Sequence, residues 1–420
     1  MSNVFCCAIA GSIALTALGI QPIFANTNNE SQSQQLSPPS WHPVESVQPA
    51  NRTELAASEV DFAPYINTYA ELVYQNYSDA HRQAMMMQDA IATFLAQPTA
   101  ETQKAAQDAW IMARQSYLQT EAFRFYEGPI DFVNPETGEE GPEGRINAWP
   151  MNEAFIDYVQ GKADAGIINN PEMDITIEEI LKNDQVTDEA DVTTGWHAIE
   201  FLLWGQDFND NGPGQRSFSD FVPNQSNNSD RRREYLTLVT QQLVSDLAFL
   251  ESEWQPYADN YRAEFVTSDP EAVVSDIFTS LATLSAFEMA SERMAVALDS
   301  GNQEDEHSCF SDTTHQDFIF NAQGIKNVYF GDYGSYDGQG FNELVAQLNP
   351  ALEQQISFAL SNTEMAVGSI NQPFDQVLAS PLGSPEREEV EAAITAFEDQ
   401  ADLFRALGPV FGVDVEILAE

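Results

Sequence analysis

The sequence predicts an all-α fold. Over much of the 420 residues, apolar side chains recur at the three- and four-residue spacing that gathers them on one face of a helix. Patterns typical of helix starts, such as residues 99–102, precede several of these segments. With 43% hydrophobic residues, a chain of this length can also fill two sizeable cores. We therefore expect two mostly helical domains.

The first 59 residues are expected to lie outside those domains. An apolar run from Val4 to Ile20, followed by Ala25 and a polar stretch, is typical of a secretory signal peptide cleaved after Ala25, although no Lys or Arg precedes the run. Residues 26–59 have the Gln-, Ser-, Asn- and Pro-rich composition of a flexible leader. No later stretch reaches the roughly 18 apolar residues that span a bilayer. We expect an exported protein of the periplasm or cell envelope, without a transmembrane helix in the mature chain.

The first half of the ordered chain is expected to hold three long helices, several short ones and one further long helix. The spacing predicts helices from about residue 62, over 79–95, over 99–118, over 153–160, over 177–182, around 193–205 and over 230–254. Residues 123–147 are rich in Gly and Pro, and we expect a loop there.

The second half begins with a helix that Pro270 opens and that continues to about Leu298. Residues 301–340 are polar and Gly-rich, with at most one apolar run over 325–330, and two or three helices are expected between 341 and 407. Residues 99–110 and 384–397 share a capped start, a run of acids and alanines, and a closing aromatic residue. This weak internal sequence similarity is consistent with two related halves.

The charge balance excludes one class of partner. The chain carries 66 Asp and Glu against 17 Lys and Arg, a formal net charge of -49. Nucleic acid would be repelled, because there is no excess of cations to replace the counterions of phosphate. Only Cys309 remains after the expected cleavage, so the mature chain can form no internal disulfide.

His197 and Glu200 are the most prominent candidate site residues. They lie three residues apart, on one face of a helix that is otherwise apolar. Burying an imidazole and a carboxylate in such surroundings costs several kcal/mol unless each has a partner. The pair therefore requires a metal, an arginine or a hydrogen-bond network, and a purely structural pair satisfies the same pattern.

Further candidate ligands lie outside this helix. Residues 304–315 are dense in carboxylates and imidazoles, which suits a metal site, although an acidic loop would have the same composition. Arg124 and Arg293 could instead neutralise Glu200 without a metal. Residues 207–212 begin like a calcium-binding EF-hand loop, but Phe218 stands where a bidentate Glu is needed.

Several motifs together resemble one known family. Residues 195–200 fit the GxHxxE signature of imelysin-like proteins, and the stretches 113–125, 128–131 and 304–315 are similar to that family as well. The similarity spans roughly residues 60–415 and, within the family, resembles the iron-regulated protein A branch. It implies two four-helix-bundle-like domains related by internal duplication, which we place at 60–258 and 259–420, with a site between them.

The resemblance places the signature at that site, and the ionisable residues noted elsewhere in the chain are its candidate partners. The ligand-binding residues would be Gly195, His197, Glu200, Glu121, Arg124 and Asp312. The metal ligands would be His197, Glu200, Glu306 and His315.

Three functions remain open. Many imelysin-like proteins are associated with iron uptake, and iron accepts mixed imidazole and carboxylate ligands, so we expect binding of iron or a small iron-linked ligand. The family takes its name from a reported peptidase, which makes a zinc-dependent peptidase the alternative. That chemistry usually needs HExxH, and here Phe201 is the residue four after His197. The third possibility is a metal-free envelope receptor for a peptide, haem or protein partner.

Overall fold

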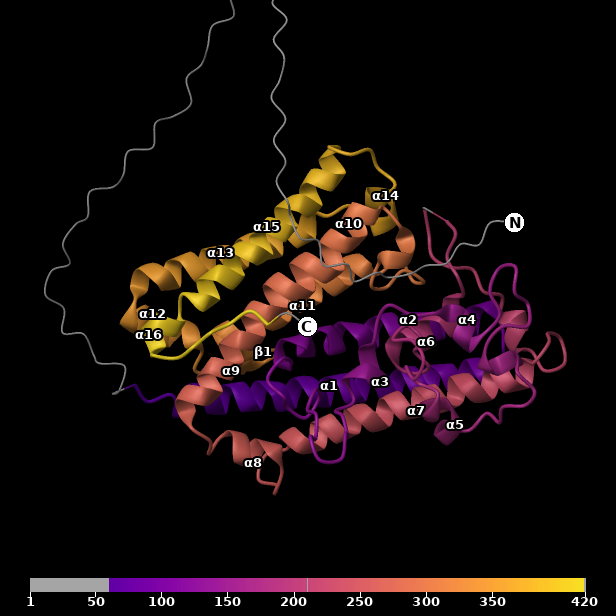
Figure 1. Cartoon of the computed structure of the whole chain (residues 1–420), viewed down its shortest axis with the longest axis horizontal. Helices are drawn as coiled ribbons and strands as arrows, with labels where there is room; N and C mark the ends of the chain where they lie inside the picture. Colours follow the sequence, from indigo (N-terminus) through magenta and orange to yellow (C-terminus); the bar gives the residue numbers. More distant parts are fainter. Residues whose placement is uncertain (1–59, 210, 419–420) are drawn as a thin grey trace, which may run out of the picture. The chain divides into compact units, whose positions relative to one another are not determined.

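The computed structural model describes residues 60–209 and 211–418, and almost all of the elements in these ranges are helices (Figure 1). The long helices are α1 (Ala63–Ala96), α2 (Ala100–Leu118), α7 (Ser229–Trp254), α9 (Pro270–Thr283), α11 (Thr314–Phe330), α13 (Pro350–Ser369) and α15 (Pro385–Arg405). The all-α prediction is confirmed. The internal duplication and the domain boundaries stay predictions, and the expected signal peptide and leader lie outside the described residues.

Shorter elements connect the long helices. They are η2 (Gln119–Phe123), α3 (Glu143–Asn147), α4 (Glu153–Ile156), η3 (Ile167–Asn169), α5 (Ile177–Lys182), α6 (Gly195–Trp204), η4 (Phe218–Phe221), α8 (Tyr261–Phe265), η5 (Leu284–Ala295), α10 (Val296–Ser300), η6 (Gln303–Asp305), α12 (Phe341–Leu348), α14 (Phe374–Leu378) and α16 (Gly408–Phe411). Two short strands, β1 (Asp332–Tyr333) and β2 (Tyr336–Asp337), pair antiparallel, with Asp332 opposite Asp337.

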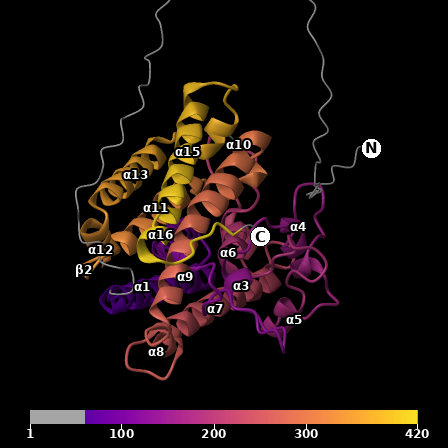
Figure 2. The ribbon, with the colours of Figure 1, turned by 60° about the vertical axis from the view of Figure 1, so that its left-hand side comes forward.

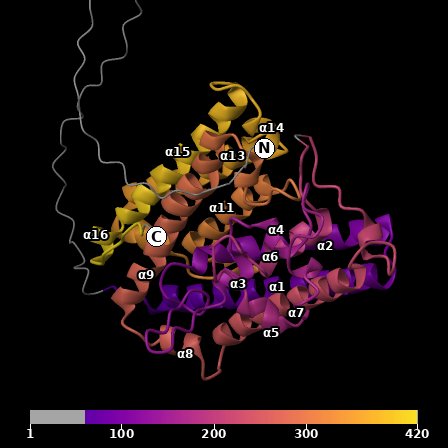
Figure 3. The same cartoon turned by 45° about the vertical axis from the view of Figure 1, so that its right-hand side comes forward.

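The N-terminal group of helices is built on α1. Helices α2 and α7 both pack along α1, and α6 packs against α2 and α7 (Figures 1 and 3). The buried face of α1 follows the helical repeat, as at Tyr69, Val73 and Tyr77, which are almost fully buried. The indole ring of Trp110 on α2 packs edge-on against Trp196 on α6, with ring centroids 6.2 Å apart. These contacts fix α6 deep inside the group.

The C-terminal group of helices is built on α15. This helix packs against α9, η5 and α13, and α11 packs against α13 (Figure 2). Its start follows the sequence: Ser384 caps the first turn by accepting a hydrogen bond from the Arg387 N–H, and Pro385 occupies the first helical position. Aromatic rings of Phe278, Phe404 and neighbouring residues fill the core beneath it.

Helix α11 joins the two groups. It lies against η2 and α2 of the N-terminal group as well as α13 of the C-terminal group. A Cβ atom at Gly324 would lie 2.4 Å from the carbonyl oxygen of Gln119, so only glycine permits this close approach of α11 to η2. The candidate site residues lie close to this junction.

Some predicted helix boundaries were wrong. Helix α1 continues unbroken through residue 79, where a second helix was expected to begin, because no Gly or Pro interrupts residues 65–96. Residues 301–340 contain the long helix α11, which was not predicted. Its buried face carries polar side chains, including Asp317, Asn321 and Asn327, and these conceal the apolar repeat. Residues 123–147 end in the short helix α3, and the helix expected over 153–160 ends at Ile156.

The segment from Pro270 to Ser300 is one continuous helical run, as the sequence predicts, but its middle part, η5, is a π-helix. Among the described residues this run is long and apolar enough to cross a bilayer, which differs from the expectation of no such stretch. Because 67% of its most apolar window is buried inside the protein, the run has the character of a core helix.

Gly324 provides a test of the junction. Gly324→Ala should lower the free energy of unfolding by roughly 1–3 kcal/mol, because the new methyl group overlaps the Gln119 backbone and forces α11 away from η2. Gly368→Ala is the matched control. It also lies within a helix, but its Cβ would meet nothing within 4 Å, so it should be neutral or stabilising by up to about 1 kcal/mol. Urea unfolding measures both, and equal effects of the two substitutions would contradict the close junction.

Candidate functional site

Helix α6 lies wholly in the interior, and every residue from Gly195 to Trp204 is buried. Gly195 adopts a φ of +85°, and a Cβ atom there would lie 2.4 Å from the carbonyl oxygen of Ile146, so both the backbone and the close contact with α3 require glycine. The expected threonine cap differs in detail, because the Thr194 hydroxyl donates to the carbonyl oxygen of Arg145 at 3.0 Å instead of capping the helix. The predicted glycine end is present at Gly205.

His197 and Glu200 form a buried pair on α6. The distance from His197 Nδ1 to Glu200 Oε2 is 2.9 Å, and the two side chains are 1% and 0% exposed. The other carboxylate oxygen, Oε1, accepts hydrogen bonds from the Ser311 N–H at 2.9 Å and from the Ser311 hydroxyl at 2.6 Å. The loop that precedes α11 therefore fixes the far side of Glu200.

Arg114 is the cation that contacts this pair, and it was not among the residues predicted from the sequence. Its Nη2 lies 3.4 Å from His197 Nε2 and 3.3 Å from His307 Nδ1, and its Nη1 donates to Asn147 Oδ1. Arg114 is only 2% exposed. A signal was present, since Arg114 follows Trp110 by four residues and so lies on the buried face of α2. Because arginine only donates, His197 accepts at Nε2 and its Nδ1 carries the hydrogen that bonds Glu200.

His307 lies beside His197 and has its own carboxylate. The two imidazole ring centroids are 4.8 Å apart, and the Trp149 ring lies 4.8 Å from that of His197. His307 Nδ1 lies 2.9 Å from Asp317 Oδ2, and because a carboxylate only accepts, Nδ1 carries the hydrogen and the 3.3 Å approach of Arg114 to the same nitrogen is not a hydrogen bond. The same Asp317 oxygen accepts from the Ser308 hydroxyl at 2.6 Å. This arrangement leaves Nε2 of His307 with its lone pair, as in histidines that a carboxylate orients for ligand binding.

Glu121 occupies the centre of a second charge cluster. Its Oε2 accepts from Arg293 Nη2 at 2.7 Å and from Arg124 Nη1 at 3.2 Å. Arg293 also bonds Glu288 at 2.6 Å, and Arg124 bonds Glu143 at 3.2 Å. Burial alone would raise the pKa of Glu121, but the two guanidinium groups hold it at about 2.

The hypothesis that Arg124 and Arg293 neutralise Glu200 directly is therefore corrected. Both cations form ion pairs with Glu121 and its acidic neighbours. Glu121 is connected to the pair on α6 through Asn147, whose amide donates to Glu121 Oε1 at 3.3 Å. Arg114, which also bonds Asn147, is the cation at the histidine.

A pocket of about 430 Å³ opens beside this network. Its wall carries guanidinium, carboxylate, indole and imidazole groups, the side chains of Arg124, Arg293, Glu288, Trp149 and His307 among them. His307 thus links the solvent-reachable pocket to the buried pair on α6. The arrangement can receive a polar ligand of small-molecule size at an imidazole that is already oriented.

Burial sets the protonation states of the core of the site. It lowers the pKa of both His197 and His307 well below the usual value, and the nearby Arg114 and Arg293 lower it further, so both imidazoles are neutral at neutral pH. Burial raises the pKa of Glu200 to about 8, even though Ser311 and Arg114 favour the ionised form. Glu200 therefore exchanges its proton within the physiological range.

The structure does not bring the four expected metal ligands together. His315 lies in the first turn of α11 and is half-buried, and the carboxyl group of Glu306 faces Asp375. Among the described residues, three ligand atoms lie within 4.8 Å of one another at Asp207, Asp312 and Asp375, a group that excludes His197, Glu200, Glu306 and His315. Asp312 belongs to that carboxylate group, and not to the pocket. Its neighbour Ser311 is the residue that contacts Glu200.

The chain is similar to known proteins over most of its described length. The family model described as imelysin, of the peptidase M75 class, matches residues 73–404. Iron-regulated protein A from Synechococcus elongatus is 26% identical over 340 residues, which cover 78% of this chain and 81% of that protein. A crystal structure of a candidate iron-regulated protein A precursor from Parabacteroides distasonis has a TM-score of 0.64 at 18% identity and covers 87% of this chain and 97% of its own. At that identity the crystal structure shows a shared fold.

The pKa of Glu200 gives a test of the site. The pKa of Glu200 is about 8 in the folded protein, whereas the ordinary value for a glutamate is 4.5. Between pH 4.5 and pH 8, the folded protein therefore keeps a proton on Glu200 that the unfolded chain has released. The stabilisation is complete below about pH 4.5 and is lost as the pH rises through 8. Between about pH 5 and pH 9, wild-type stability should fall by roughly 2–4 kcal/mol more than that of Glu200→Gln.

Urea unfolding across this range measures the difference. Glu136→Gln, which removes an exposed carboxylate, should keep the wild-type pH dependence. If wild type and Glu200→Gln lose stability equally, Glu200 does not carry the raised pKa.

Proposed function

The chain belongs to the imelysin family, and from that membership we propose that it acts in iron acquisition at the cell envelope by binding iron or an iron-linked ligand. Binding is proposed to take place in the pocket of about 430 Å³ that contains His307, with the network of Arg114, His197 and Glu200 behind it. The name of the Synechococcus relative, iron-regulated protein A, supports the link to iron.

The orientation of His307 is the observation that carries this proposal. Its Nδ1 is held by Asp317 at 2.9 Å, burial keeps its pKa low, and the residue lines the pocket. A neutral imidazole whose second nitrogen keeps its lone pair is a good ligand for iron. Glu288 lies on the same wall and offers carboxylate oxygens, which iron accepts beside imidazole, while Arg124 and Arg293 hold the carboxylates around them in place.

The network behind His307 is proposed to hold the imidazole in place. Asp317 is itself fixed by the Ser308 hydroxyl, and Arg114 lies against both histidines. Groups that orient a ligand in this way commonly change metal affinity by about 10- to 100-fold when removed. His197 and Glu200 then act as positioning residues for the pocket.

A metal-free receptor is the second candidate, and the position of Arg114 favours it. Its guanidinium group lies at His197 Nε2, which is the atom that a metal on α6 would need. The zinc peptidase alternative meets the same obstacle, and Phe201, buried four residues after His197, offers no second ligand. In the receptor alternative, the pocket would bind a peptide or haem-type ligand through charge and stacking alone.

Isothermal titration calorimetry with ferrous ion, ferric citrate and zinc tests the proposal. Wild type should bind ferrous ion or ferric citrate at one site, and His307→Ala should weaken that binding by about tenfold or more. His81→Ala is the matched control, since His81 pairs with Glu251 on α7 and does not line the pocket, so it should bind as wild type does. A salt concentration of about 0.15 M screens the exposed carboxylates.

The outcomes separate the candidates. Wild type that binds neither form of iron, or a folded His307→Ala that binds as tightly as wild type, contradicts iron binding in this pocket. Tight binding of zinc without iron, together with cleavage of a protein substrate that a chelator and Glu200→Gln both abolish, would support the peptidase. Circular dichroism verifies that each variant is folded.

Export is proposed on the composition of residues 1–25. We expect the protein recovered from the periplasm or cell envelope to begin at Asn26, because cleavage follows Ala25. N-terminal sequencing and intact mass measure this directly. Protein that retains Met1 and remains in the cytoplasmic fraction would contradict the expectation.

A further inference from the structure

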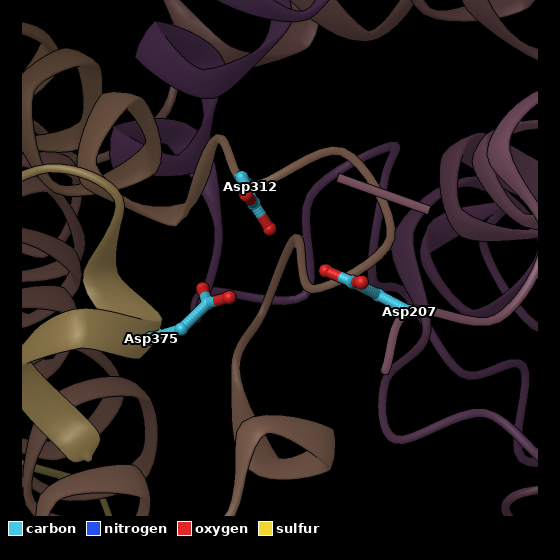
Figure 4. A group of neighbouring side chains, drawn as sticks. All are labelled: Asp207, Asp312 and Asp375. Carbon is cyan, nitrogen blue, oxygen red and sulfur yellow. The ribbon is translucent and has the colours of Figure 1, made fainter. Parts of the chain in front are cut away.

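Three buried carboxylates converge at a place away from the pocket. Asp207 lies in the loop after α6, Asp312 in the loop before α11, and Asp375 on α14, and Figure 4 shows their side chains pointing toward one another. They are 4%, 7% and 2% exposed. One oxygen of each lies within 4.8 Å of an oxygen of the other two. Residues from three separate elements thus meet in one small volume.

Asp312 provides an independent sign of a ligand. Both of its carboxylate oxygens are fully buried and lack a hydrogen-bond donor, and the side chain points into the group (Figure 4). Buried acceptors without a donor are rare in folded proteins, because each leaves its desolvation cost of roughly 1–3 kcal/mol uncompensated. A bound cation would supply the missing interaction.

Glu306 adds a fourth carboxyl group at the same place. It is 0% exposed, its strongest charged neighbours are Asp375 and Asp312, and the Thr314 hydroxyl is the neutral donor beside it. Among the described residues, no Lys, Arg or His forms an ion pair with Asp207, Asp312 or Glu306. Asp207 receives hydrogen bonds from neutral donors, among them the Gln303 amide at 2.6 Å and the Asn209 N–H at 3.0 Å. Within the described part of the chain, no side-chain cation therefore balances the charges of Asp207, Asp312 and Glu306.

Either protons or a cation must balance Asp207, Asp312 and Glu306. Burial and the neighbouring Asp375 raise the pKa of Asp312 to about 9, and burial raises that of Glu306 well above its usual value. Both shifts reflect the unfavourable placement of several ionised carboxylates in one buried volume. A bound divalent ion stabilises the ionised carboxylates and so lowers their pKa values.

We propose that Asp207, Asp312 and Asp375, with Glu306 beside them, form a binding site for a hard divalent cation of the calcium class. Carboxylate oxygens within 4.8 Å of one another can all reach one ion at close to the 2.3–2.6 Å of Ca²⁺–oxygen bonds with only a small inward movement. Mg²⁺ demands shorter bonds of about 2.0–2.1 Å and a near-ideal octahedron, which fits this spacing less well. An all-oxygen set also disfavours zinc, which prefers nitrogen and sulfur ligands.

This site is separate from the proposed iron pocket but shares a loop with it. Asp312 faces the carboxylates, while the adjacent Ser311 bonds Glu200. A cation here ties α14 of the C-terminal group of helices to the loop that follows α6. It thereby stabilises the position of Ser311 against the α6 pair.

Calcium titration of chelator-treated full-length protein tests the site. Isothermal titration calorimetry in about 0.15 M salt should detect one tight Ca²⁺ site in wild type above any weak surface binding. Asp312→Asn and Asp207→Asn should each weaken that site by about tenfold or more, because each removes a charged oxygen ligand. Asn keeps the shape and removes like-charge repulsion, so both variants should fold.

Two controls separate this site from the surface and from the iron pocket. Glu136→Gln removes an exposed carboxylate, and His307→Ala alters the pocket, and both should keep wild-type Ca²⁺ affinity. The melting temperature should rise with Ca²⁺ in wild type and in His307→Ala, and should not respond in Asp312→Asn.

Each contrary outcome overturns the proposal. Wild type that shows no tight Ca²⁺ site, or Asp312→Asn and Asp207→Asn that both retain wild-type affinity, would mean that the carboxylates share protons. Equal stabilisation of wild type and Asp312→Asn by Ca²⁺ would assign the effect to the acidic surface. Failure of iron binding leaves these results unaffected, because no variant here removes a pocket residue except the His307→Ala control.

Discussion

The buried guanidinium group of Arg114 is the interaction on which the rest of the site depends. An arginine that is 2% exposed needs a countercharge and hydrogen-bond acceptors, and Asp317 on α11 supplies the countercharge, with its Oδ1 3.8 Å from Arg114 Nε. The histidines His197 and His307 lie against Nη2, and Asn147 accepts from Nη1. Because arginine stays protonated, it sets the tautomer of His197 and thereby the direction of its bond to Glu200. One side chain of α2 thus organises α6, α3 and the loop before α11.

The sequence predicted the elements whose chemistry is local and missed those that depend on distant contacts. The helix that carries His197 and Glu200, its closing glycine and the proximity of the two side chains all follow from spacing within ten residues. Helix α11 was not predicted, because its buried face is polar and finds its partners on other helices. Asp317 lies on that helix and bonds His307, ten residues earlier, through a turn that periodicity does not reveal.

The loop of residues 306–313 explains why predicted ligands separated in the structure. His307 faces the pocket, Ser311 bonds Glu200, and Asp312 faces Asp207 and Asp375. Successive side chains of an irregular segment point in different directions, so a dense run of acids and histidines is distributed among several sites. A composition with 66 Asp and Glu conceals which carboxylates are buried, and burial decides their chemistry.

The proposed binding of iron rests on family membership and on the oriented imidazole of His307, which lines the pocket together with Arg124 and Arg293. The most direct measurement is anomalous X-ray diffraction at the iron absorption edge from crystals soaked in ferric citrate. We expect one strong anomalous peak in that pocket, within bonding distance of His307 Nε2. A peak only at the carboxylates of Asp207, Asp312 and Asp375, or no peak in the protein, would contradict it.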